Sequence, residues 1–280
     1  EEINNIINLD ERQLRTYDGK HRAYMGCAEF DTGEKRTFTD NINFKWSGRN
    51  MLLWANKMME DNYSDTVKKM PILDELGEKT DEKILGYDLV MVAHYAYYDI
   101  KFISKFLSNY SEIVVGTSLK AASGTFKSPY CDKPLIVKII DSINFLPFAL
   151  DKFGKNLHFK QEKDVMPYHA YTIDNLRGEN PKVDLDEILD EWENNAYDAD
   201  KKKQQFCNNL NQLNMIDDNM VDMIGYAEYY CKLDVEVLAK GFLKYQALME
   251  DAVGEKCIDY LGLPSMANGY CEKNGVFEDV

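Results

Sequence analysis

Leu89-Val-Met-Val-Ala-His-Tyr-Ala-Tyr-Tyr-Asp-Ile-Lys-Phe-Ile103 is the stretch of sequence from which the fold is best predicted. Its first six residues are mostly apolar, and a short run of this kind is typical of a buried strand. From Asp99 onward the apolar residues Ile100, Ile103 and Phe106 return at helical spacing. We therefore predict a buried strand that leads to Asp99 and a helix that begins there. The aspartate then either caps the helix or also faces a cleft at the sheet edge.

Two hairpins are predicted on either side of this stretch. Residues 23–30 and 36–39 flank Asp31-Thr-Gly-Glu34, a strand–turn–strand pattern. The second hairpin is expected across residues 113–141, whereas residues 61–82 are polar and charged and predict an insertion or loop. Helices are expected over residues 50–59, 143–153, 184–194, 201–213 and 217–249, the last one broken near Leu233. Since strands and helices mix without regular alternation, we expect an α/β (α+β) fold with a central mixed sheet surrounded by helices.

Charge and cysteine content exclude several classes of protein. The net charge of −15 argues against a module that binds duplex DNA electrostatically, because such affinity normally comes from Lys and Arg. It is compatible with an enzyme that holds a short single strand through metal ions, since metal-binding carboxylates add negative charge. The six cysteines form no C-x-x-C pair, which disfavours a zinc site and indicates free thiols of an intracellular, reducing compartment. No apolar run approaches the roughly 18 residues that cross a bilayer, so no membrane partner is expected.

Acidic residues stand at two further informative places. In Tyr230-Cys-Lys-Leu-Asp234 the tyrosine and the aspartate share one helical face. A tyrosine beside a metal-bound aspartate can hold an attacking water, although a packed tyrosine and a solvated aspartate are the simpler interpretation. In Glu29-Phe-Asp-Thr32 two acids alternate, and alternate residues of a strand point to the same face. Glu29 and Asp31 can therefore aim two carboxylates at one cation pair, unless Asp31 only opens the turn.

Together these acids predict a phosphodiesterase that uses two metal ions. Asn8-Leu9-Asp10 is a rival for the first position, but it offers one acid and one amide and is the poorer metal site. Two hard cations about 3.5–4 Å apart can activate a water and stabilise the leaving oxygen. Mg²⁺ or Mn²⁺ is expected, because the ligands are hard oxygens and the sequence has no His or Cys cluster. The predicted metal ligands are Glu29, Asp31, Asp99 and Asp234.

These motifs resemble the exonuclease motifs of family B DNA polymerases. Glu29–Thr32 resembles the first motif, His94–Ile103 the second and Tyr230–Asp234 the third. The most specific string is Lys138-Ile-Ile-Asp-Ser-Ile-Asn-Phe-Leu-Pro-Phe148, which resembles the single-strand-binding segment of the protein-primed branch. That branch occurs in phages, linear plasmids, viruses and self-synthesising transposons. The likeness covers roughly residues 23–270.

The resemblance implies a fold, an activity and partners. Residues 1–250 are expected to form an RNase H-like, DEDD-type 3′–5′ exonuclease domain, and residues 251–280 to begin the segment that leads into the polymerase half. The sequence starts without a methionine, and we expect it to be a fragment of a longer chain. The implied activity is proofreading of single-stranded 3′ ends by metal-dependent hydrolysis. The implied partners are the single-stranded DNA end and the rest of the polymerase chain, with a terminal protein as a further candidate.

The resemblance also assigns roles to single residues. Tyr98 matches the aromatic residue on which a terminal base rests, and Ser142 and Ile143 match a pair that contacts the single strand. With them, Phe145 is expected to line one groove. Lys163 lies where the family has a lysine close to the scissile phosphate, and Tyr230 would orient the water.

Two departures from the family pattern leave other functions open. The first motif reads E-x-D instead of D-x-E, which moves each carboxylate by one methylene. Tyr95 stands where the family usually has Asn, which removes a polar contact to the primer end. The domain is therefore expected to be a nuclease of reduced activity or one that has lost activity. An exonuclease fold that serves as a protein-binding or structural subunit is the alternative, and a free-standing nuclease for RNA or DNA is the third interpretation.

Overall fold

The computed structural model describes residues 24–160, 163–193 and 199–276. These residues form two compact units. The first unit takes the described residues up to Met51 and those between Phe159 and Ala239, and the second takes residues 52–158 and those from Lys240 onward. Two helices, α2 (Ser47–Asn62) and α8 (Met223–Val253), begin in one unit and continue in the other.

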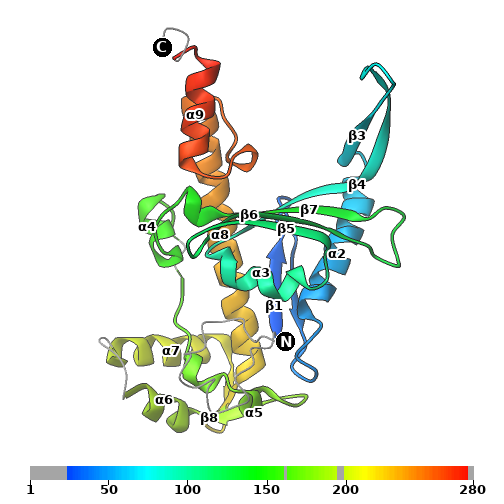
Figure 1. The fold of residues 1–280 in the computed structure, drawn as a ribbon. Coiled ribbons are helices and arrows are strands. Elements are labelled where there is room, and N and C mark those ends of the chain that lie inside the picture. The colour runs from blue at the N-terminus through cyan, green and yellow to red at the C-terminus, as the bar shows by residue number, and fades with distance from the viewer. Residues whose placement is uncertain (1–23, 161–162, 194–198, 277–280) are drawn as a thin grey trace. The chain divides into compact units, whose positions relative to one another are not determined.

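The second unit is built on a five-stranded mixed sheet (Figure 1). Its strands are β3 (Val67–Leu73), β4 (Lys79–Ala93), β5 (Ser108–Val115), β6 (Ser118–Phe126) and β7 (Leu135–Asp141). They lie in the order β3-β4-β7-β6-β5; β4 and β7 are parallel, and the other neighbours are antiparallel. With helices beside this sheet, the predicted α/β fold class is confirmed. The hairpin predicted across residues 113–141 is present as β6 and β7, and β5 extends it by one strand.

The apolar sequence of β7 explains its central place. Leu135, Val137, Ile139 and Ile140 are buried, and the strand has neighbours on both sides. A strand that is covered on both faces needs a nearly continuous apolar run, which the sequence Leu-Ile-Val-Lys-Ile-Ile supplies. Helix α3 (Ala96–Ser104) packs against β6 and β7.

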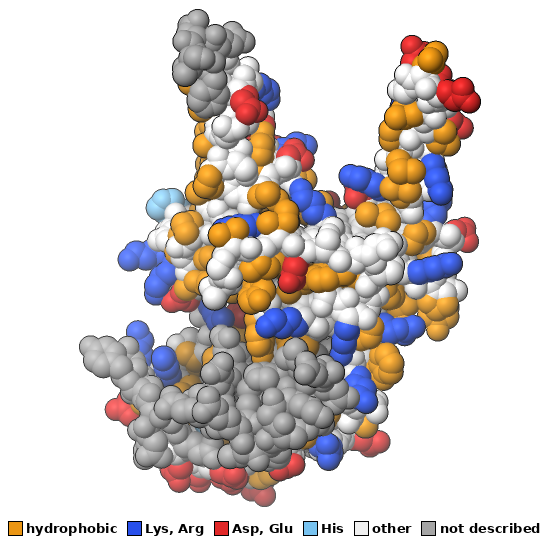
Figure 2. All heavy atoms as spheres, viewed as in Figure 1, with side chains coloured by type: hydrophobic (Ala, Val, Ile, Leu, Met, Phe, Trp, Pro, Cys, Tyr) orange, Lys and Arg blue, Asp and Glu red, His pale blue; other side chains and the backbone are white. Residues whose placement is uncertain are grey.

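Three expectations from the sequence are wrong in detail. Residues 61–82 were expected to be an insertion or loop; they are not a loop, because most of them form the β3–β4 hairpin, which projects beyond the sheet (Figure 1). Its apolar side chains are exposed among charged ones (Figure 2).

The helix expected over 143–153 is divided into η1 (Ser142–Asn144), η2 (Leu150–Lys152) and α4 (Phe153–Asn156). Pro147 accounts for the interruption, because proline lacks a backbone donor and disfavours helical geometry in the residue before it. The break expected near Leu233 is absent, since α8 is continuous there.

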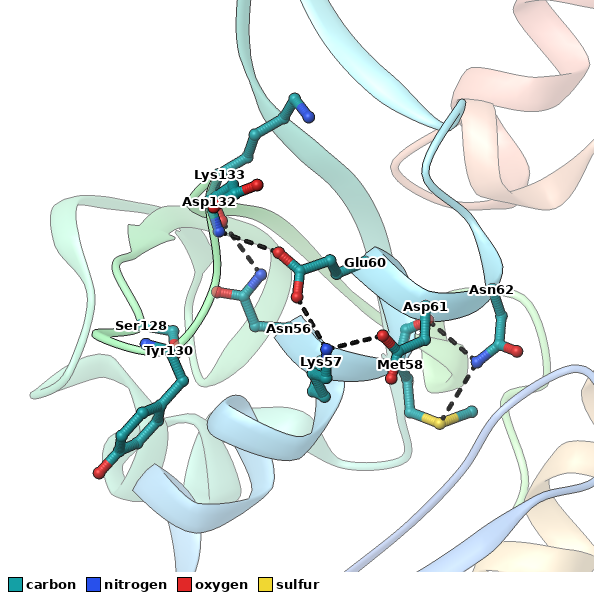
Figure 3. Close-up of polar contacts among 10 residues, drawn as sticks. All are labelled: Asn56, Lys57, Met58, Glu60, Asp61, Asn62, Ser128, Tyr130, Asp132 and Lys133. Carbon is teal, nitrogen blue, oxygen red and sulfur yellow. Dashed lines mark hydrogen bonds and ion pairs between the residues drawn. The ribbon is translucent and has the colours of Figure 1, made fainter.

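The loop between β6 and β7 is tied to α2 by side chains of that helix (Figure 3). Glu60 Oε1 accepts a hydrogen bond from the backbone N–H of Asp132 at 2.9 Å. Asn56 Nδ2 donates to the carbonyl oxygen of Lys133 at 3.2 Å, and Lys57 pairs with Glu60 at 3.0 Å. Asn56 and Glu60 lie one helical turn apart on one face, so they hold two successive backbone groups of the loop.

Two short helices follow α8 at the carboxyl end of the second unit. These are η4 (Cys257–Asp259) and α9 (Leu263–Lys273). Helix α9 carries Pro264 in its first turn, where a missing donor costs nothing. Lys138 Nζ, from β7, donates to the carbonyl oxygen of Ile258 at 2.5 Å, which joins this segment to the sheet.

The first unit combines a hairpin, a small sheet and helices around one core. The hairpin is β1 (Met25–Glu29) with β2 (Lys35–Thr39), as predicted. A three-stranded antiparallel sheet contains β8 (Lys182–Asp184), β10 (Met220–Asp222) and β9 (Ile216–Asp217). The helices are η3 (Tyr168–Ala170), α5 (Ile173–Leu176), α6 (Leu185–Glu193), α7 (Ala199–Leu213) and the first part of α8. Phe206, Tyr226 and Tyr171 are among the fully buried side chains of its core.

In the part of the chain that the structure describes, no helix combines the length and the apolar character needed to cross a bilayer.

Candidate active site

Glu29 occupies the last position of β1 and faces α8. Its register partner is Lys35, the first residue of β2. Lys35 Nζ lies 2.6 Å from Glu236 Oε2 on α8 and 3.7 Å from Glu29 Oε2. The side chain of Glu29 is 13% exposed. In the middle of the hairpin, Thr37 Oγ1 donates to Glu228 of the same helix at 2.7 Å. The hairpin is thus held against α8 by polar contacts, with the carboxylate of Glu29 at its edge.

Asp31 lies in the turn that follows β1 and is exposed. The turn is closed by two backbone hydrogen bonds, from Phe30 N to Glu34 O at 2.9 Å and from Gly33 N to Phe30 O at 2.8 Å. Gly33 has a φ of 84°, which glycine adopts without strain. Because the strand ends at Glu29, strand alternation does not extend to Asp31. The rival Asp10 lies outside the described residues.

Lys163, Tyr230 and Asp234 are brought together in the first unit. Lys163 Nζ lies 3.1 Å from Asp234 Oδ2 and 5.3 Å from the centre of the Tyr230 ring. Tyr230 and Asp234 are one turn apart on α8, as the sequence predicted, and Tyr230 is 2% exposed. Three of the predicted catalytic residues therefore form one cluster, although Lys163 is distant from the other two in the chain.

The charges of this cluster are set by burial. Burial raises the pKa of Asp234 above its ordinary value and outweighs the lowering effects of Lys163 and of a hydrogen bond from Tyr230. Burial, followed by the charge of Asp234, raises the pKa of Tyr230 far above its ordinary value. The hydroxyl group of Tyr230 therefore stays protonated. Its oxygen lies 2.8 Å from the hydroxyl oxygen of Tyr168.

Tyr168 and Asp164 also contact this cluster or the helix that carries it, although no motif in the sequence marks them. Asp164 Oδ2 accepts a hydrogen bond from the hydroxyl group of Tyr229 at 2.8 Å, and its Oδ1 accepts one from Gln205 Nε2 at 2.8 Å. These bonds attach the residue next to Lys163 to α8 and α7. Sequence spacing reveals only that Asp164 and Tyr168 are near Lys163. It does not reveal which distant side chains they meet.

Asp99 lies in the second unit, in the first turn of α3, and is exposed. The prediction that the helix begins at Asp99 is wrong, because α3 begins at Ala96. The residue at the N-cap is Tyr95, whose side chain makes no capping hydrogen bond. The ring of Tyr98 lies on the same helix, 5.7 Å from the ring of Phe102. Asp99 thus stands near the carboxyl end of β4, but it does not cap the helix.

Asp141 provides the contacts that a capping residue would supply. It ends β7, directly opposite Ala93 at the end of the parallel strand β4. Its Oδ1 accepts from the N–H of Tyr95 at 2.9 Å and from the N–H of Ile143 at 3.2 Å, and its Oδ2 accepts from the N–H of Ala96 at 2.9 Å. Asp141 lies within the string Lys138–Phe148, but the resemblance implies no role for it.

The residues predicted to contact a single strand differ in exposure. Ser142 is buried, and its Oγ lies 2.8 Å from Nδ1 of His94. Phe145 is buried, and its ring lies 6.3 Å from that of Phe242. Phe145 therefore has the position of a core aromatic. Ile143 and Tyr98 are partly exposed.

The donor atoms of the predicted acids suit a divalent cation, although the described residues do not assemble a full site. Carboxylate oxygens are the ligands that Mg²⁺ and Mn²⁺ prefer. Asp234 Oδ1 is buried and has no hydrogen-bond partner among the residues that the structure describes, so a cation would satisfy it. Across the described ranges, no three His, Cys, Asp or Glu side chains come together as a metal site. Asp99 belongs to the other unit, and its distance from Asp234 stays a prediction.

The chain resembles solved structures of Phi29 DNA polymerase at low sequence identity. The Phi29 DNA polymerase complexed with primer-template DNA and incoming nucleotide substrates is similar to 74% of this chain at 14% identity, with a TM-score of 0.32. The Phi29 DNA polymerase complexed with single-stranded DNA gives the same identity, coverage and TM-score. The match takes 32% and 33% of those two polymerases, so the chain spans about a third of their length. A likeness at this TM-score carries no weight for the fold. No curated protein matches the chain.

A family model provides the assignment. Residues 79–274, well over half of the chain, match the model described as DNA polymerase type B, organellar and viral. The matched range includes the second and third motifs and the string Lys138–Phe148. The chain therefore belongs to the organellar and viral family of type B DNA polymerases.

Proposed function

We propose that this chain is the 3′–5′ exonuclease region of a protein-primed family B DNA polymerase. Residues 1–250 would form the exonuclease domain, and residues 251–280 would lead toward the polymerase half. The observation that carries the proposal is the contact among Lys163, Tyr230 and Asp234. Tyr230 and Asp234 belong to one sequence motif, and the family resemblance indicated Lys163 at a distant position. The three side chains meet in one partly buried cluster.

Glu29, Asp31, Asp99 and Asp234 are the proposed ligands of Mg²⁺ or Mn²⁺. When bound, the cations would supply an activated water and charge stabilisation at the leaving oxygen. Asp234 has the strongest support, because its buried Oδ1 has no hydrogen-bond partner in the described part of the chain. Its pKa is raised because burial makes the charged carboxylate costly, and a bound cation would offset that cost.

Tyr230 and Lys163 are the proposed positioning groups for water and phosphate. The protonated hydroxyl group of Tyr230 can both donate and accept a hydrogen bond, and Tyr168 restrains its direction from 2.8 Å away. Lys163 carries a positive charge that balances Asp234 in the free protein. A phosphate group bound beside Lys163 would be a second anionic partner for this ammonium group. Hydrogen bonds between an ammonium group and an anion are charge-assisted and stronger than neutral ones.

The proposed substrate is the 3′ end of single-stranded DNA. Tyr98 and Ile143 would contact bases or sugars, because both side chains are partly exposed, while Ser142 and Phe145 support them from the buried side. Aromatic stacking binds any base, which suits an enzyme that acts on every sequence. The remainder of the polymerase chain, and a terminal protein, are further proposed partners. The six free thiols fit a reducing compartment.

A primer-degradation assay tests this function. A labelled oligo-dT is incubated with the chain in Mg²⁺ or in Mn²⁺, and shortening from the 3′ end is followed. Asp234→Ala and Asp99→Ala should each lower the rate by orders of magnitude, because each removes a proposed ligand. Asp217→Ala is the matched control, since Asp217 is 85% exposed in an ion pair with Lys182. Faster cleavage in Mn²⁺ than in Mg²⁺ is expected, because Mg²⁺ tolerates a displaced ligand poorly.

The proposal also predicts a distance. Asp99 and Asp234 would both hold the same pair of cations, so their carboxylates should lie within about 8 Å when metal is bound. A crystal structure with Mn²⁺ that separates them much further would contradict the shared site.

A protein-binding or structural subunit is the second candidate. The exposed turn position of Asp31 favours it, because that carboxylate is not aligned with Glu29 on a strand. Under this candidate the chain would be inert with either ion and would bind no oligo-dT.

A further inference from the structure

Asp141 connects two segments that leave the sheet at the same edge. Strands β4 and β7 are parallel, so their carboxyl ends lie together, with Ala93 opposite Asp141. The carboxylate accepts three backbone N–H groups, two from the start of α3 and one from η1. Asp141 is 2% exposed. A single buried side chain thus fastens the segment that carries Tyr98 to the segment that carries Ile143.

The backbone at Tyr95 is strained, and Asp141 holds it. Tyr95 has φ 59° and ψ 43°, the left-handed region that suits Gly, Asn or Asp rather than a bulky side chain. Its side chain is 58% exposed, so burial of the ring does not account for the conformation. The N–H groups of Tyr95 and Ala96 both point to the Asp141 carboxylate, and hydrogen bonds to an ionised acceptor are stronger than neutral ones. Strain of this kind persists only where the surroundings impose it.

Neighbouring contacts reinforce the same connection. Asn144 Nδ2 donates to the carbonyl oxygen of Asp141 at 3.0 Å, and Lys120 Nζ donates to Asn144 Oδ1 at 2.7 Å. His94, the residue before Tyr95, meets Ser142 at 2.8 Å. Burial raises the pKa of Asp141, and its three backbone hydrogen bonds and the charge of Lys120 oppose that shift.

We propose that Asp141 is a positioning residue that holds α3 and η1 in one geometry, so that Tyr98 and Ile143 present a single surface to a DNA strand. This inference rests on the proposed function, because it assumes that the surface binds single-stranded DNA. It assigns to Asp141 a role in substrate affinity that a simple helix cap would not have.

Asp141→Asn tests the role, since it keeps the shape of the side chain but loses its charge and one acceptor. Binding of fluorescent oligo-dT should weaken about tenfold, roughly the loss of one stacked base. Amide hydrogen exchange should accelerate at Tyr95, Ala96 and Ile143 together, because one carboxylate serves all three. Asp132→Asn is the control, an exposed aspartate of the same unit. Adding Tyr95→Gly to Asp141→Asn should restore part of the affinity, because glycine adopts the left-handed turn without support.

The outcomes separate the two proposals. If the unmodified chain binds no oligo-dT, the proposed function fails and this inference fails with it. If the unmodified chain binds and Asp141→Asn binds equally well, the proposed function stands and Asp141 is only a cap. Loss of affinity without any rescue by Tyr95→Gly would also contradict the positioning role. Should Asp141→Asn not fold, the double variant is compared with the unmodified chain. Unchanged affinity together with unchanged hydrogen exchange at Ile143, whose contact to Asp141 the glycine does not replace, overturns the inference.

Discussion

Lys163 Nζ lies 3.1 Å from Asp234 Oδ2, and the same ammonium group lies 5.3 Å from the centre of the Tyr230 ring. The pair balances a negative charge that burial makes costly. It also draws the loop that carries Lys163 onto α8, at the helical turn that holds the third family motif. Charge balance and positioning therefore depend on one contact.

Stability in the absence of metal should depend on the ionisation of Asp234. Its pKa is raised in the folded protein, so between its ordinary value and the raised value the folded state holds a proton that the unfolded state releases. Stability from this group is therefore complete at low pH and is lost as the pH rises through the raised pKa. Asp234→Asn should melt at a higher temperature than the unmodified chain at pH 7 in EDTA, and the difference should shrink in acid. Asp217→Asn should show no such trend, and a lower melting temperature for Asp234→Asn at pH 7 would refute the argument.

Tyr168→Phe should affect cleavage through Tyr230. The change removes the hydroxyl group that lies 2.8 Å from the Tyr230 hydroxyl oxygen, in a partly buried setting. A lost hydrogen bond of this kind costs about 1 kcal/mol of stability. We expect a lower kcat with little change in KM, since Tyr168 would orient Tyr230 and not bind substrate. With Tyr230→Phe already present, Tyr168→Phe should have almost no further effect on kcat; full additivity would show that the two hydroxyl groups act separately.

Tyr95→Asn should stabilise the protein. The left-handed backbone at this position costs a bulky residue about 1 kcal/mol more than it costs Asn. The urea midpoint should therefore rise while the slope of the transition stays constant. Tyr130→Asn is a suitable control, because Tyr130 is also well exposed but has no positive φ. A fall in the midpoint would mean that the exposed ring of Tyr95 makes a stabilising contact.

Tyr98→Ala should weaken the binding of oligo-dT. Loss of a stacked base costs about 1–3 kcal/mol, which corresponds to roughly tenfold or more in Kd. Tyr130→Ala serves as the exposed control on the β6–β7 loop. Fluorescence anisotropy at fixed salt concentration measures the affinity of both variants for oligo-dT. If the unmodified chain, Tyr98→Ala and Tyr130→Ala bind oligo-dT equally well, Tyr98 is a packing residue of α3, where its ring lies beside that of Phe102.

The reversed first motif can be tested by restoring the family order. Glu29→Asp together with Asp31→Glu should keep or raise exonuclease activity, because the longer side chain then starts from the turn and can reach further. Asp31→Ala alone should lower the rate by orders of magnitude if Asp31 is a ligand. If Asp31→Ala has no effect and Asp10→Ala abolishes cleavage, the first motif lies at Asp10.

The sequence by itself determined those elements whose signals are local. The turn Asp31-Thr-Gly-Glu34 between alternating residues predicted the β1–β2 hairpin, and helical spacing placed Tyr230 and Asp234 on one face. Periodicity of two or about 3.6 residues is a property of the backbone, so it can be read without knowing the partner of each side chain. The start of α3 was misplaced because its capping group, Asp141, is 45 residues away from Ala96 in the chain.

Only the tertiary structure decided which of these side chains meet. It paired Lys163 with Asp234, placed Phe145 in the core beside Phe242, and made Asp141 the acceptor for two separate segments. The reason is that contacts between distant residues depend on how elements pack and which groups lose water, and neither is encoded in local spacing. Motifs therefore indicated candidate residues, while burial and hydrogen bonding decided which of these side chains lie together and which are packed in the core.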